Sequence, residues 1–441
     1  MKGLGLKKLA GNVAATLARQ LGAGLLQLAT LALIARVYGA EGNGAYTVAL
    51  LLPTMLASLL NLGIGPANVY YLGSSQVSPQ VAWRSTLKLY VGISIVGLAI
   101  GSVVLLLYAR QWFPGVPELL LWFALSIFPV ALLCSFVSSM FQGLQQFRQF
   151  NVVLLLQPLL TLLFIVLLVI AGVRSIGWLL SAYLVGSVVT VLVGLKVLRP
   201  FLIHSEDDQF QSVAYGKTVI GYGYKAHLSN ILAFINYKAD IFLVNLFMGL
   251  AGAGVYVIAV QISERLWLLS QAVSTVLLPR LSELSSEEDK RKALTPFIAR
   301  WVLFVTFLGS LVLAVIAYPV IKLVFGVEFV GAVIPLLILL PGIVVLATSR
   351  VFANDIAARG RPELNMFASI IVVAVNIIGN LLLIPYYGLI GASIATSIAY
   401  VIDFSIRIAI HRFFTGVPVL KSVLICAEDF VLLNKLIRNR N

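Results

Sequence analysis

The chain has 441 residues, of which 60% are hydrophobic and only 11% are charged, and its mean hydropathy is +1.02. This composition excludes an ordinary soluble globular protein and indicates helices that cross a bilayer. The formal net charge of +14 does not indicate nucleic-acid binding, because the basic residues are scattered along the predicted loops, where such residues determine membrane topology.

Twelve apolar runs are long enough to cross a membrane, which takes about 20 residues of helix. We predict an all-α, polytopic membrane protein with spans at residues 11–35, 43–66, 86–108, 118–140, 151–171, 176–197, 220–247, 254–279, 300–321, 331–352, 365–384 and 388–410. The first run is too long for the apolar region of a signal peptide, so we expect a retained first span. Residues 413–441 are too interrupted for a thirteenth span and predict an amphipathic surface segment.

One glycine-rich stretch occurs twice. GAEGNGAYTVA at Gly39–Ala49 and GLAGAGVYVIA at Gly249–Ala259 share the pattern Gly-x-x-Gly-x-Gly-x-Tyr-x-x-Ala at an offset of 210 residues. Each copy predicts a tight turn at the membrane surface, because glycine tolerates positive φ and close approach of backbones. The tyrosine of each copy, Tyr46 or Tyr256, suits the interface, where its ring is apolar and its hydroxyl is wet.

Further matches indicate that the whole bundle is duplicated. Asn151 and Asn365 each open an apolar run at an offset of 214 residues. The loop Lys and Arg residues are concentrated on one side and predict that both termini are cytoplasmic. Six spans per half is an even number, so the two repeats are parallel. The predicted parts are an N-terminal six-helix lobe at 1–199, a cytoplasmic linker at 200–218, a C-terminal six-helix lobe at 219–412 and a cytoplasmic tail at 413–441.

Charged residues inside apolar runs are functional candidates, because each costs about 3 kcal/mol or more in hydrocarbon. The candidates are Arg19 in the first span, Lys225, Lys238 and Asp240 in the seventh, Glu264 and Arg265 in the eighth, and Asp403 and Arg407 in the twelfth. The repeat-equivalent positions that we compared, those of Arg19 and of the charges at residues 238, 240, 264 and 265, are uncharged in the other half. This asymmetry favours a specialised task over a role in the scaffold.

These candidates also have structural interpretations. Asp403 and Arg407 are four residues apart on one helix, a spacing that allows an internal ion pair. Four others could form either a substrate site or a structural network between neighbouring helices: Lys238, Asp240, Glu264 and Arg265. Arg19 has no obvious acidic partner in its own half, which makes it the strongest candidate for a cation that faces a cavity.

Motifs of enzymes and ATP-driven pumps are absent from the sequence. It contains no Walker loop, no Gly-x-Ser-x-Gly elbow and no zinc motif. Its three histidines are dispersed, and its two cysteines, Cys134 and Cys426, indicate no disulfide framework. We therefore predict a protein without catalytic residues, metal or cofactor.

Three blocks resemble the polysaccharide-type flippases of the multidrug/oligosaccharidyl-lipid/polysaccharide exporter superfamily. They are LIARVYGAEGNGAYTVALLLPTMLASLLNLGIGPANVYYL at residues 33–72, ADIFLVNLFMGLAGAGVYVIAVQISERLWLLSQAVSTVLLPRLSEL at residues 239–284, and IPYYGLIGASIATSIAYVIDF at residues 384–404. The closing CAEDFVLLNKLIRNRN is similar to the short acidic-then-basic tail of many members. The resemblance covers nearly the whole chain, and its motifs are specific in combination and order.

The resemblance implies two six-helix lobes that face each other as a V, alternating access, and transport of undecaprenyl-diphosphate-linked oligosaccharide across the bacterial cytoplasmic membrane. It implies that cations on spans 1, 7 and 8 receive the diphosphate, here Arg19, Lys238 and Arg265, with Lys225 as a further member. Asp240 and Glu264 depart from a uniformly positive cavity and could couple transport to H⁺ or Na⁺. Membrane lipids and a polysaccharide polymerase are the expected partners.

The sequence leaves two other functions open. A drug or organic-cation antiporter of the same superfamily would need an acidic cavity. A comparison of how tightly the protein binds an anionic lipid-linked glycan and organic cations would distinguish this antiporter from the flippase. A membrane glycan ligase normally needs a sizeable extracytoplasmic loop with Arg, His or carboxylates, and the predicted outside loops are too short for that. A purely structural membrane scaffold would not require the intramembrane charges.

Overall fold

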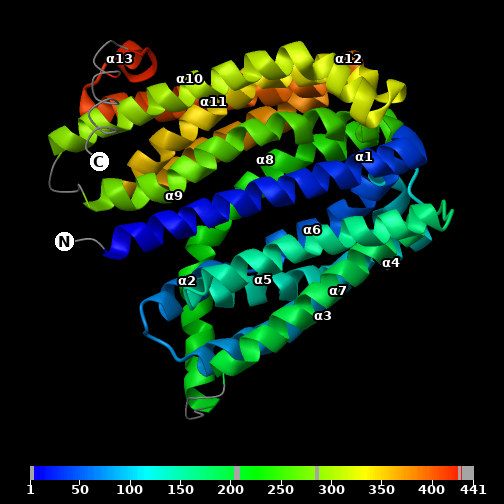
Figure 1. Ribbon diagram of the computed structural model, residues 1–441, viewed down its shortest axis with the longest axis horizontal. Helices are drawn as coiled ribbons and strands as arrows, with labels where there is room; N and C mark the ends of the chain where they lie inside the picture. Colours follow the sequence, from blue (N-terminus) through cyan, green and yellow to red (C-terminus); the bar gives the residue numbers. More distant parts are fainter. Residues whose placement is uncertain (1–3, 203–208, 284–287, 426–428, 430–441) are drawn as a thin grey trace. The chain divides into compact units, whose positions relative to one another are not determined.

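The structure, a computed structural model, describes residues 4–202, 209–283, 288–425 and 429, and every regular element within these ranges is helical (Figure 1). The α-helices are α1 (Leu4–Leu60), α2 (Ile64–Gly73), α3 (Pro79–Trp112), α4 (Glu118–Leu125), α5 (Ile127–Gly143), α6 (Phe147–Ile170), α7 (Ile176–Leu202), α8 (Gln209–Ser263), α9 (Leu268–Glu283), α10 (Glu288–Val320), α11 (Val333–Ala358), α12 (Pro362–Thr415) and α13 (Val419–Val423). Short segments of other helix type join them: the 3-10 helices η1 (Glu264–Trp267) and η3 (Val327–Ala332), and the π-helix η2 (Ile321–Phe325).

The helices account for all the predicted spans. Within the described ranges, nine helices are long and apolar enough to cross a membrane. Three of these, in α1, α8 and α12, are broken by a glycine with positive φ, at Gly39, Gly249 and Gly388. When each broken helix is taken as two spans, a helix lies at each of the twelve predicted positions. The predicted all-α, polytopic fold class is confirmed.

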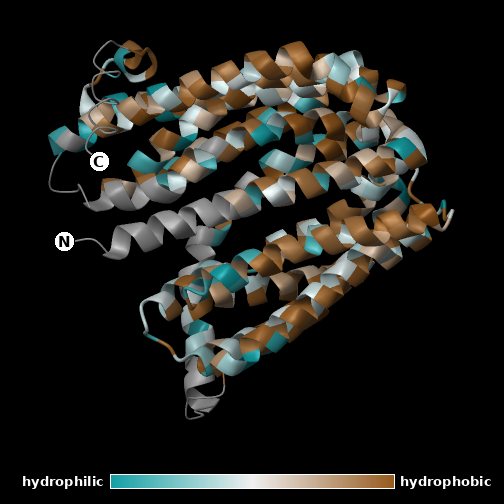
Figure 2. Ribbon diagram, viewed as in Figure 1, coloured by the Kyte–Doolittle hydropathy of each residue, from teal (hydrophilic) through white to brown (hydrophobic). Residues whose placement is uncertain are grey.

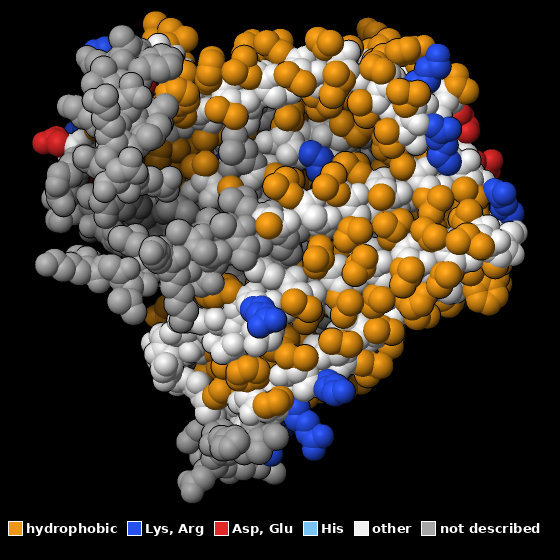
Figure 3. Space-filling model, in the orientation of Figure 1, with side chains coloured by type: hydrophobic (Ala, Val, Ile, Leu, Met, Phe, Trp, Pro, Cys, Tyr) orange, Lys and Arg blue, Asp and Glu red, His pale blue; other side chains and the backbone are white. Residues whose placement is uncertain are grey.

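Large apolar side chains cover the outer surface of the helices. Leu106, Ile170 and Val315 expose 73%, 77% and 81% of their surface. Figure 2 shows apolar residues along most of the length of the helices, and Figure 3 shows hydrophobic side chains spread over the face in view. A soluble monomer rarely exposes such extensive apolar surface, whereas hydrocarbon solvates it. The described surface is that of a protein embedded in a membrane.

The chain divides into two compact units. The first comprises Met1–Ile258 with Lys322–Phe329, and the second comprises Ala259–Ile321 with Val330–Asn441. In the first unit, α6 packs against α7 and α1, and α2 packs against α5. In the second unit, α11 packs against α12, α10 and α9.

The predicted six-helix lobes rest on the internal sequence repeat, which a division by contacts does not test, so their boundaries stay a prediction. Residues 203–208 of the predicted linker lie outside the described residues. The same holds for residues 426–428 and 430–441 of the predicted amphipathic tail, whose described part contains the last three residues of α12 and the short helix α13.

Each unit has its own packed interior. In the first unit, Phe128, Leu132 and Phe136 of α5 are fully buried. In the second unit, Val351 and Phe352 of α11 belong to a buried cluster that also takes side chains from α9, α10 and α12. Lipid tails are as apolar as these side chains, so close packing rather than the hydrophobic effect holds such helices together.

The duplicated glycine stretch forms the same turn twice. Gly39 has φ 70° and ψ −172°, and Gly249 has φ 70° and ψ −174°. Only glycine adopts this backbone region at low cost, because a Cβ would collide with the neighbouring backbone. The tight turns predicted from the sequence are confirmed, and each one ends one half of a long helix and starts the next.

We expect Gly249→Ala to lower the free energy of unfolding by about 1–3 kcal/mol through backbone strain alone, because no atom lies within 4 Å of the position that its Cβ would take. The matched control is Gly221→Ala, on the same α8 and equally free of neighbours but without positive φ. The measurement is the midpoint of thermal denaturation in detergent. Equal midpoints for the two variants would show that the turn does not require glycine.

The two copies of the repeat also touch each other. A Cβ on Gly44 would lie 1.8 Å from the Leu250 carbonyl oxygen, and a Cβ on Gly254 would lie 2.0 Å from the Ala40 carbonyl oxygen. Both pairs are related by the same offset of 210 residues, so the contact is pseudo-symmetric. The Asn43 side chain adds a hydrogen bond, since its Nδ2 donates to the Gly254 carbonyl oxygen at 2.8 Å. This is a close crossing of helices through small residues.

Candidate functional site

The predicted cations of the first unit lie on α1 and α8. The side chains of Arg19 and Lys225 fall outside the described residues, so their roles stay predictions. Lys238 is half-buried, and the structure records no hydrogen bond or ion pair between it and the side chains that are described. An amine within an apolar helix favours an anionic ligand, because its charge is costly there.

The carboxylate of Asp240, two residues further along α8, is hydrogen-bonded within the protein. Asp240 is 2% exposed, its Oδ2 accepts a hydrogen bond from the Tyr256 hydroxyl at 3.0 Å, and its Oδ1 accepts one from the backbone N–H of Ile241 at 2.7 Å. Tyr256 is fully buried and Tyr46 is 8% exposed. The expected position of these tyrosines at the wet interface is therefore wrong, and for Tyr256 the reason is that the carboxylate satisfies the buried hydroxyl in place of water.

Glu264 and Arg265 lie where α8 gives way to the 3-10 helix η1. Both side chains are half-buried, and Nη2 of Arg265 donates to Gln261 Oε1 at 2.5 Å. A 3-10 segment in the middle of a long helix often marks a functional hinge or local strain. The predicted network of these two residues with Lys238 and Asp240 would join different units, and it stays a prediction.

Asp403 and Arg407 form an ion pair within α12. Arg407 Nη2 lies 3.0 Å from Asp403 Oδ1, as the four-residue spacing allows. The second carboxylate oxygen, Oδ2, accepts a hydrogen bond from the Ser349 hydroxyl of α11 at 2.6 Å. Because both oxygens of Asp403 are engaged, the geometry favours the ion-pair interpretation of these residues over ion coupling.

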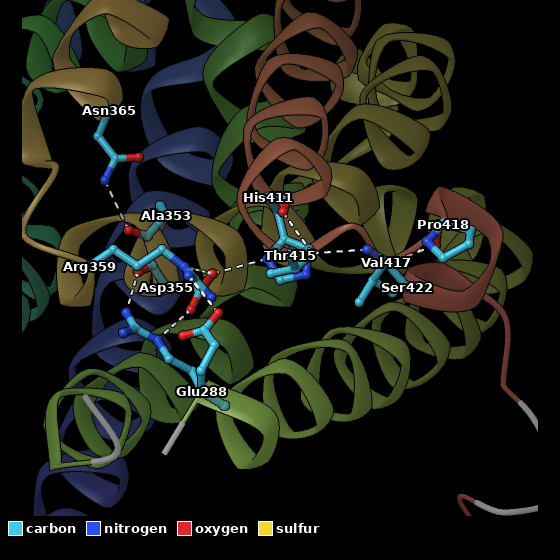
Figure 4. A network of polar contacts seen from close by, with 11 residues as sticks. Glu288, Ala353, Asp355, Arg359, Asn365, His411, Thr415, Val417, Pro418 and Ser422 are labelled. Carbon is cyan, nitrogen blue, oxygen red and sulfur yellow. Dashed lines mark hydrogen bonds and ion pairs between the residues drawn. The ribbon is translucent and has the colours of Figure 1, made fainter. Parts of the chain in front are cut away.

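A larger cluster of buried charge, around Asp355, was missed by the sequence reasoning (Figure 4). Asp355 Oδ1 accepts from Arg291 Nε at 3.0 Å, and its Oδ2 accepts from Arg359 Nε at 2.9 Å and lies 3.0 Å from Nδ1 of His411. Arg359 also pairs with Glu288 Oε1 at 2.9 Å. The cluster joins α10, α11 and α12 inside the second unit.

The position of this cluster explains why it was missed. Arg291 and Arg359 were assigned to loops as topology determinants, and Asp355 stands at the end of an apolar run. The side chains of Asp355 and His411 are completely buried. One signal was available, namely the four-residue spacing of Asp355 and Arg359, which places them on one helix face. Since every oxygen of Asp355 is satisfied by the protein, the cluster holds the helices together rather than binding a ligand.

A polar cavity of about 750 Å³ lies inside the first unit. Helices α2, α5, α6 and α7 contribute its walls, and none of the described residues that line it is charged. Its lining consists of small, apolar, aromatic, hydroxyl and amide residues: Gly65, Pro66, Val69, Tyr70, Ala131, Cys134, Ser135, Ser138, Ser139, Gln142, Phe150, Val153, Leu154, Gln157, Tyr183 and Ser187. Its size is within the range of small-molecule sites, about 300–1,000 Å³.

One face of α5 supplies much of the cavity's polarity. Ser135, Ser138 and Gln142 follow one another at intervals of three and four residues, which places them on the same side of a helix. The signal was present in the sequence as S-x-x-S-S-x-x-Q at the end of the fourth predicted span. This pattern did not lead to a predicted site, because hydroxyl and amide side chains are less conspicuous in an apolar run than charges.

Comparison with known proteins assigns the family. The sequence profile described as polysaccharide biosynthesis protein matches residues 9–285. The protein named "Probable low-salt glycan biosynthesis flippase Agl15" of Haloferax volcanii is 25% identical over 232 residues, which cover 51% of this chain and 47% of that relative. The chain thus spans about half the length of this curated relative.

Solved structures share the fold over most of the chain. The lipid II flippase MurJ in an inward closed conformation aligns with a TM-score of 0.74 and 17% identity, covering 92% of this chain and 88% of that one. An inward-facing multidrug resistance MATE transporter of the MOP superfamily aligns with a TM-score of 0.70 and 13% identity, covering 89% and 94%. The chain therefore belongs to the polysaccharide biosynthesis protein family, and it has the fold of the multidrug/oligosaccharidyl-lipid/polysaccharide exporter transporters.

Proposed function

We propose that the protein is a flippase that moves lipid-diphosphate-linked oligosaccharide units across the cytoplasmic membrane by alternating access, for export of a cell-surface polysaccharide. The family profile, the glycan flippase among its relatives and the fold shared with MurJ support this proposal. Transport of this kind needs no covalent chemistry by the protein, in keeping with a sequence without enzyme motifs.

The observation that carries the proposal is the presence of cations inside an apolar helix. Lys238 and Arg265 are half-buried within Phe234–Trp267, a segment that is long and apolar enough to cross a membrane. Each charge costs about 3 kcal/mol or more there, so a ligand that neutralises it is favoured. Arginine binds phosphate oxygens in a bidentate manner, and lysine acts as a point charge. We propose that Arg19 and Lys225 also take part in binding the diphosphate.

The remaining features of the proposal follow from the sequence. We propose that both termini are cytoplasmic, that the carrier lipid is a polyprenol such as undecaprenol, and that a polymerase takes up the product on the far side. Asp240 and Glu264 are our candidates for coupling to H⁺ or Na⁺.

A second candidate function is an ion-coupled antiporter of drugs or organic cations, favoured by the likeness to the MATE transporter. An organic cation would require an acidic partner. None of the described residues that line the polar cavity of the first unit is acidic, and its four helices, α2, α5, α6 and α7, contain no acidic residue. The composition of this cavity therefore supports the glycan flippase over the antiporter.

We expect Lys238→Ala and Arg265→Ala each to slow flipping of a fluorescent lipid-diphosphate oligosaccharide in proteoliposomes by about 10- to 100-fold, the effect of losing one hydrogen bond to a charged group. The matched control is Lys196→Ala, which removes an exposed lysine from the end of α7 and should leave the rate unchanged. Lys238→Arg should retain most of the activity, because it keeps the charge. Wild-type rates in both alanine variants would remove these residues from the site.

A further inference from the structure

The described residues that line the polar cavity of the first unit combine hydroxyl, amide and aromatic groups, and none of them is charged. We infer that the cavity is a subsite for the saccharide part of the transported molecule, separate from the cations that take the diphosphate; this inference rests on the proposed flippase function.

The wall of the cavity supplies hydrogen-bonding groups to a ligand. Ser135 and Gln142 are exposed at the cavity wall, and the structure records no hydrogen bond of either side chain with the described residues. Ser138 donates its hydroxyl proton to the Cys134 carbonyl oxygen at 2.8 Å, which leaves its lone pairs free to accept. Gln157 donates to Thr161 Oγ1 at 3.3 Å and keeps its amide oxygen for another donor.

Aromatic side chains lie in the same cavity wall as these groups. Tyr70, Phe150 and Tyr183 line the same cavity, and Tyr70 is 47% exposed. An aromatic ring gives the apolar face of a sugar ring a flat surface, while the polar groups around it pair with the hydroxyls. Ligand sites commonly combine an apolar and aromatic lining with a few placed polar groups in this way.

The chemistry of the described lining disfavours other classes of ligand. The described residues of the lining offer no cation to neutralise the two or more negative charges of a diphosphate, and no carboxylate to neutralise an organic cation. A lipid chain would leave the unpaired groups of Ser135 and Gln142 without partners, which is costly in an apolar setting. A neutral, hydroxyl-rich molecule satisfies these groups, and a saccharide is such a molecule.

The cavity contains its own reporter, the half-buried thiol of Cys134. The chain has one other cysteine, Cys426, which Cys426→Ser removes. In this background we would measure the rate of Cys134 alkylation by N-ethylmaleimide in proteoliposomes, with four probes. The probes are a free neutral disaccharide, a polyprenyl-diphosphate-linked disaccharide, the same polyprenyl diphosphate without sugar, and tetraphenylphosphonium. Flipping of the lipid-linked disaccharide is measured on the same preparation.

We expect the two sugar-bearing probes to slow alkylation and the two sugar-free probes to leave it unchanged. Replacing both amides, with Gln142→Leu and Gln157→Leu, should raise the disaccharide concentration needed for protection about tenfold or more, as expected from the loss of two hydrogen bonds. Gln149→Leu is the matched control, since it makes the same change on α6 outside the cavity lining and should leave protection intact.

The remaining outcomes separate this inference from the proposed function. Flipping without protection by either sugar probe would overturn the saccharide subsite and leave the flippase standing. Protection by the sugar-free polyprenyl diphosphate to the same extent would assign the cavity to the lipid carrier and also overturn the subsite. Sugar protection without any flipping would keep the subsite and reject the flippase. Protection by tetraphenylphosphonium alone would reject both and favour the antiporter.

Discussion

Gly254→Ala is expected to lower the free energy of unfolding by about 3 kcal/mol, the upper end of the usual cost of overpacking. The added methyl group would lie 2.0 Å from the Ala40 carbonyl oxygen and 2.8 Å from the Gly44 nitrogen. Both are backbone atoms of a helix, which cannot rotate away as a side chain can, so the helices must separate. Separation would also lengthen the 2.8 Å hydrogen bond from Asn43 to the Gly254 carbonyl oxygen.

The measurement is the midpoint of thermal denaturation in detergent, followed by tryptophan fluorescence. Gly44→Ala should behave alike, because its methyl group would lie 1.8 Å from the Leu250 carbonyl oxygen in the pseudo-symmetric contact. Gly92→Ala is the control, since nothing lies within 4 Å of its Cβ position on α3, and alanine there should stabilise the helix by about 0.5–1 kcal/mol. If Gly254→Ala unfolds at the same temperature as Gly92→Ala, the two copies of the repeat do not cross closely.

Asp355→Ala is expected to destabilise the protein by about 3–5 kcal/mol, because removing one partner of a buried ion pair leaves an uncompensated charge. Arg291 would lose its 3.0 Å partner while its side chain is only 4% exposed. His411 and Arg359 would lose their bonds to the same carboxylate. The measurement is again the denaturation midpoint, together with the fraction of monodisperse protein after size-exclusion chromatography.

The control for this prediction is the exposed pair of Arg361 and Glu363, 3.4 Å apart with side chains 61% and 43% exposed. Glu363→Ala should change stability by less than about 1 kcal/mol. The double variant Asp355→Ala with Arg291→Ala should cost clearly less than the sum of the single variants, because it removes both charges of one pair. Strict additivity would show that the two residues do not act together.

Only some of the residues of the candidate site stand out in the sequence, for physical reasons. Charges in apolar runs stand out in a sequence because they are costly there, and so Lys238, Arg265 and the pair of Asp403 and Arg407 could be named as candidates from the sequence. Hydroxyl and amide side chains carry a smaller penalty in apolar runs, and serine often bonds to its own helix backbone. The stripe of Ser135 and Gln142 therefore went unnoticed until packing placed it on a cavity.

The sequence by itself determined the membrane class, the positions of the helices and the two turns. These follow from the length of the apolar runs and from a glycine-specific conformation at Gly39 and Gly249, both of which are local properties. Only the tertiary structure decided which residues meet. Segments far apart in the chain come together in the contact of Gly44 with Leu250, in the cluster of Arg291, Asp355 and His411, and in the walls of the polar cavity. Such contacts depend on how whole helices pack, which no local pattern specifies.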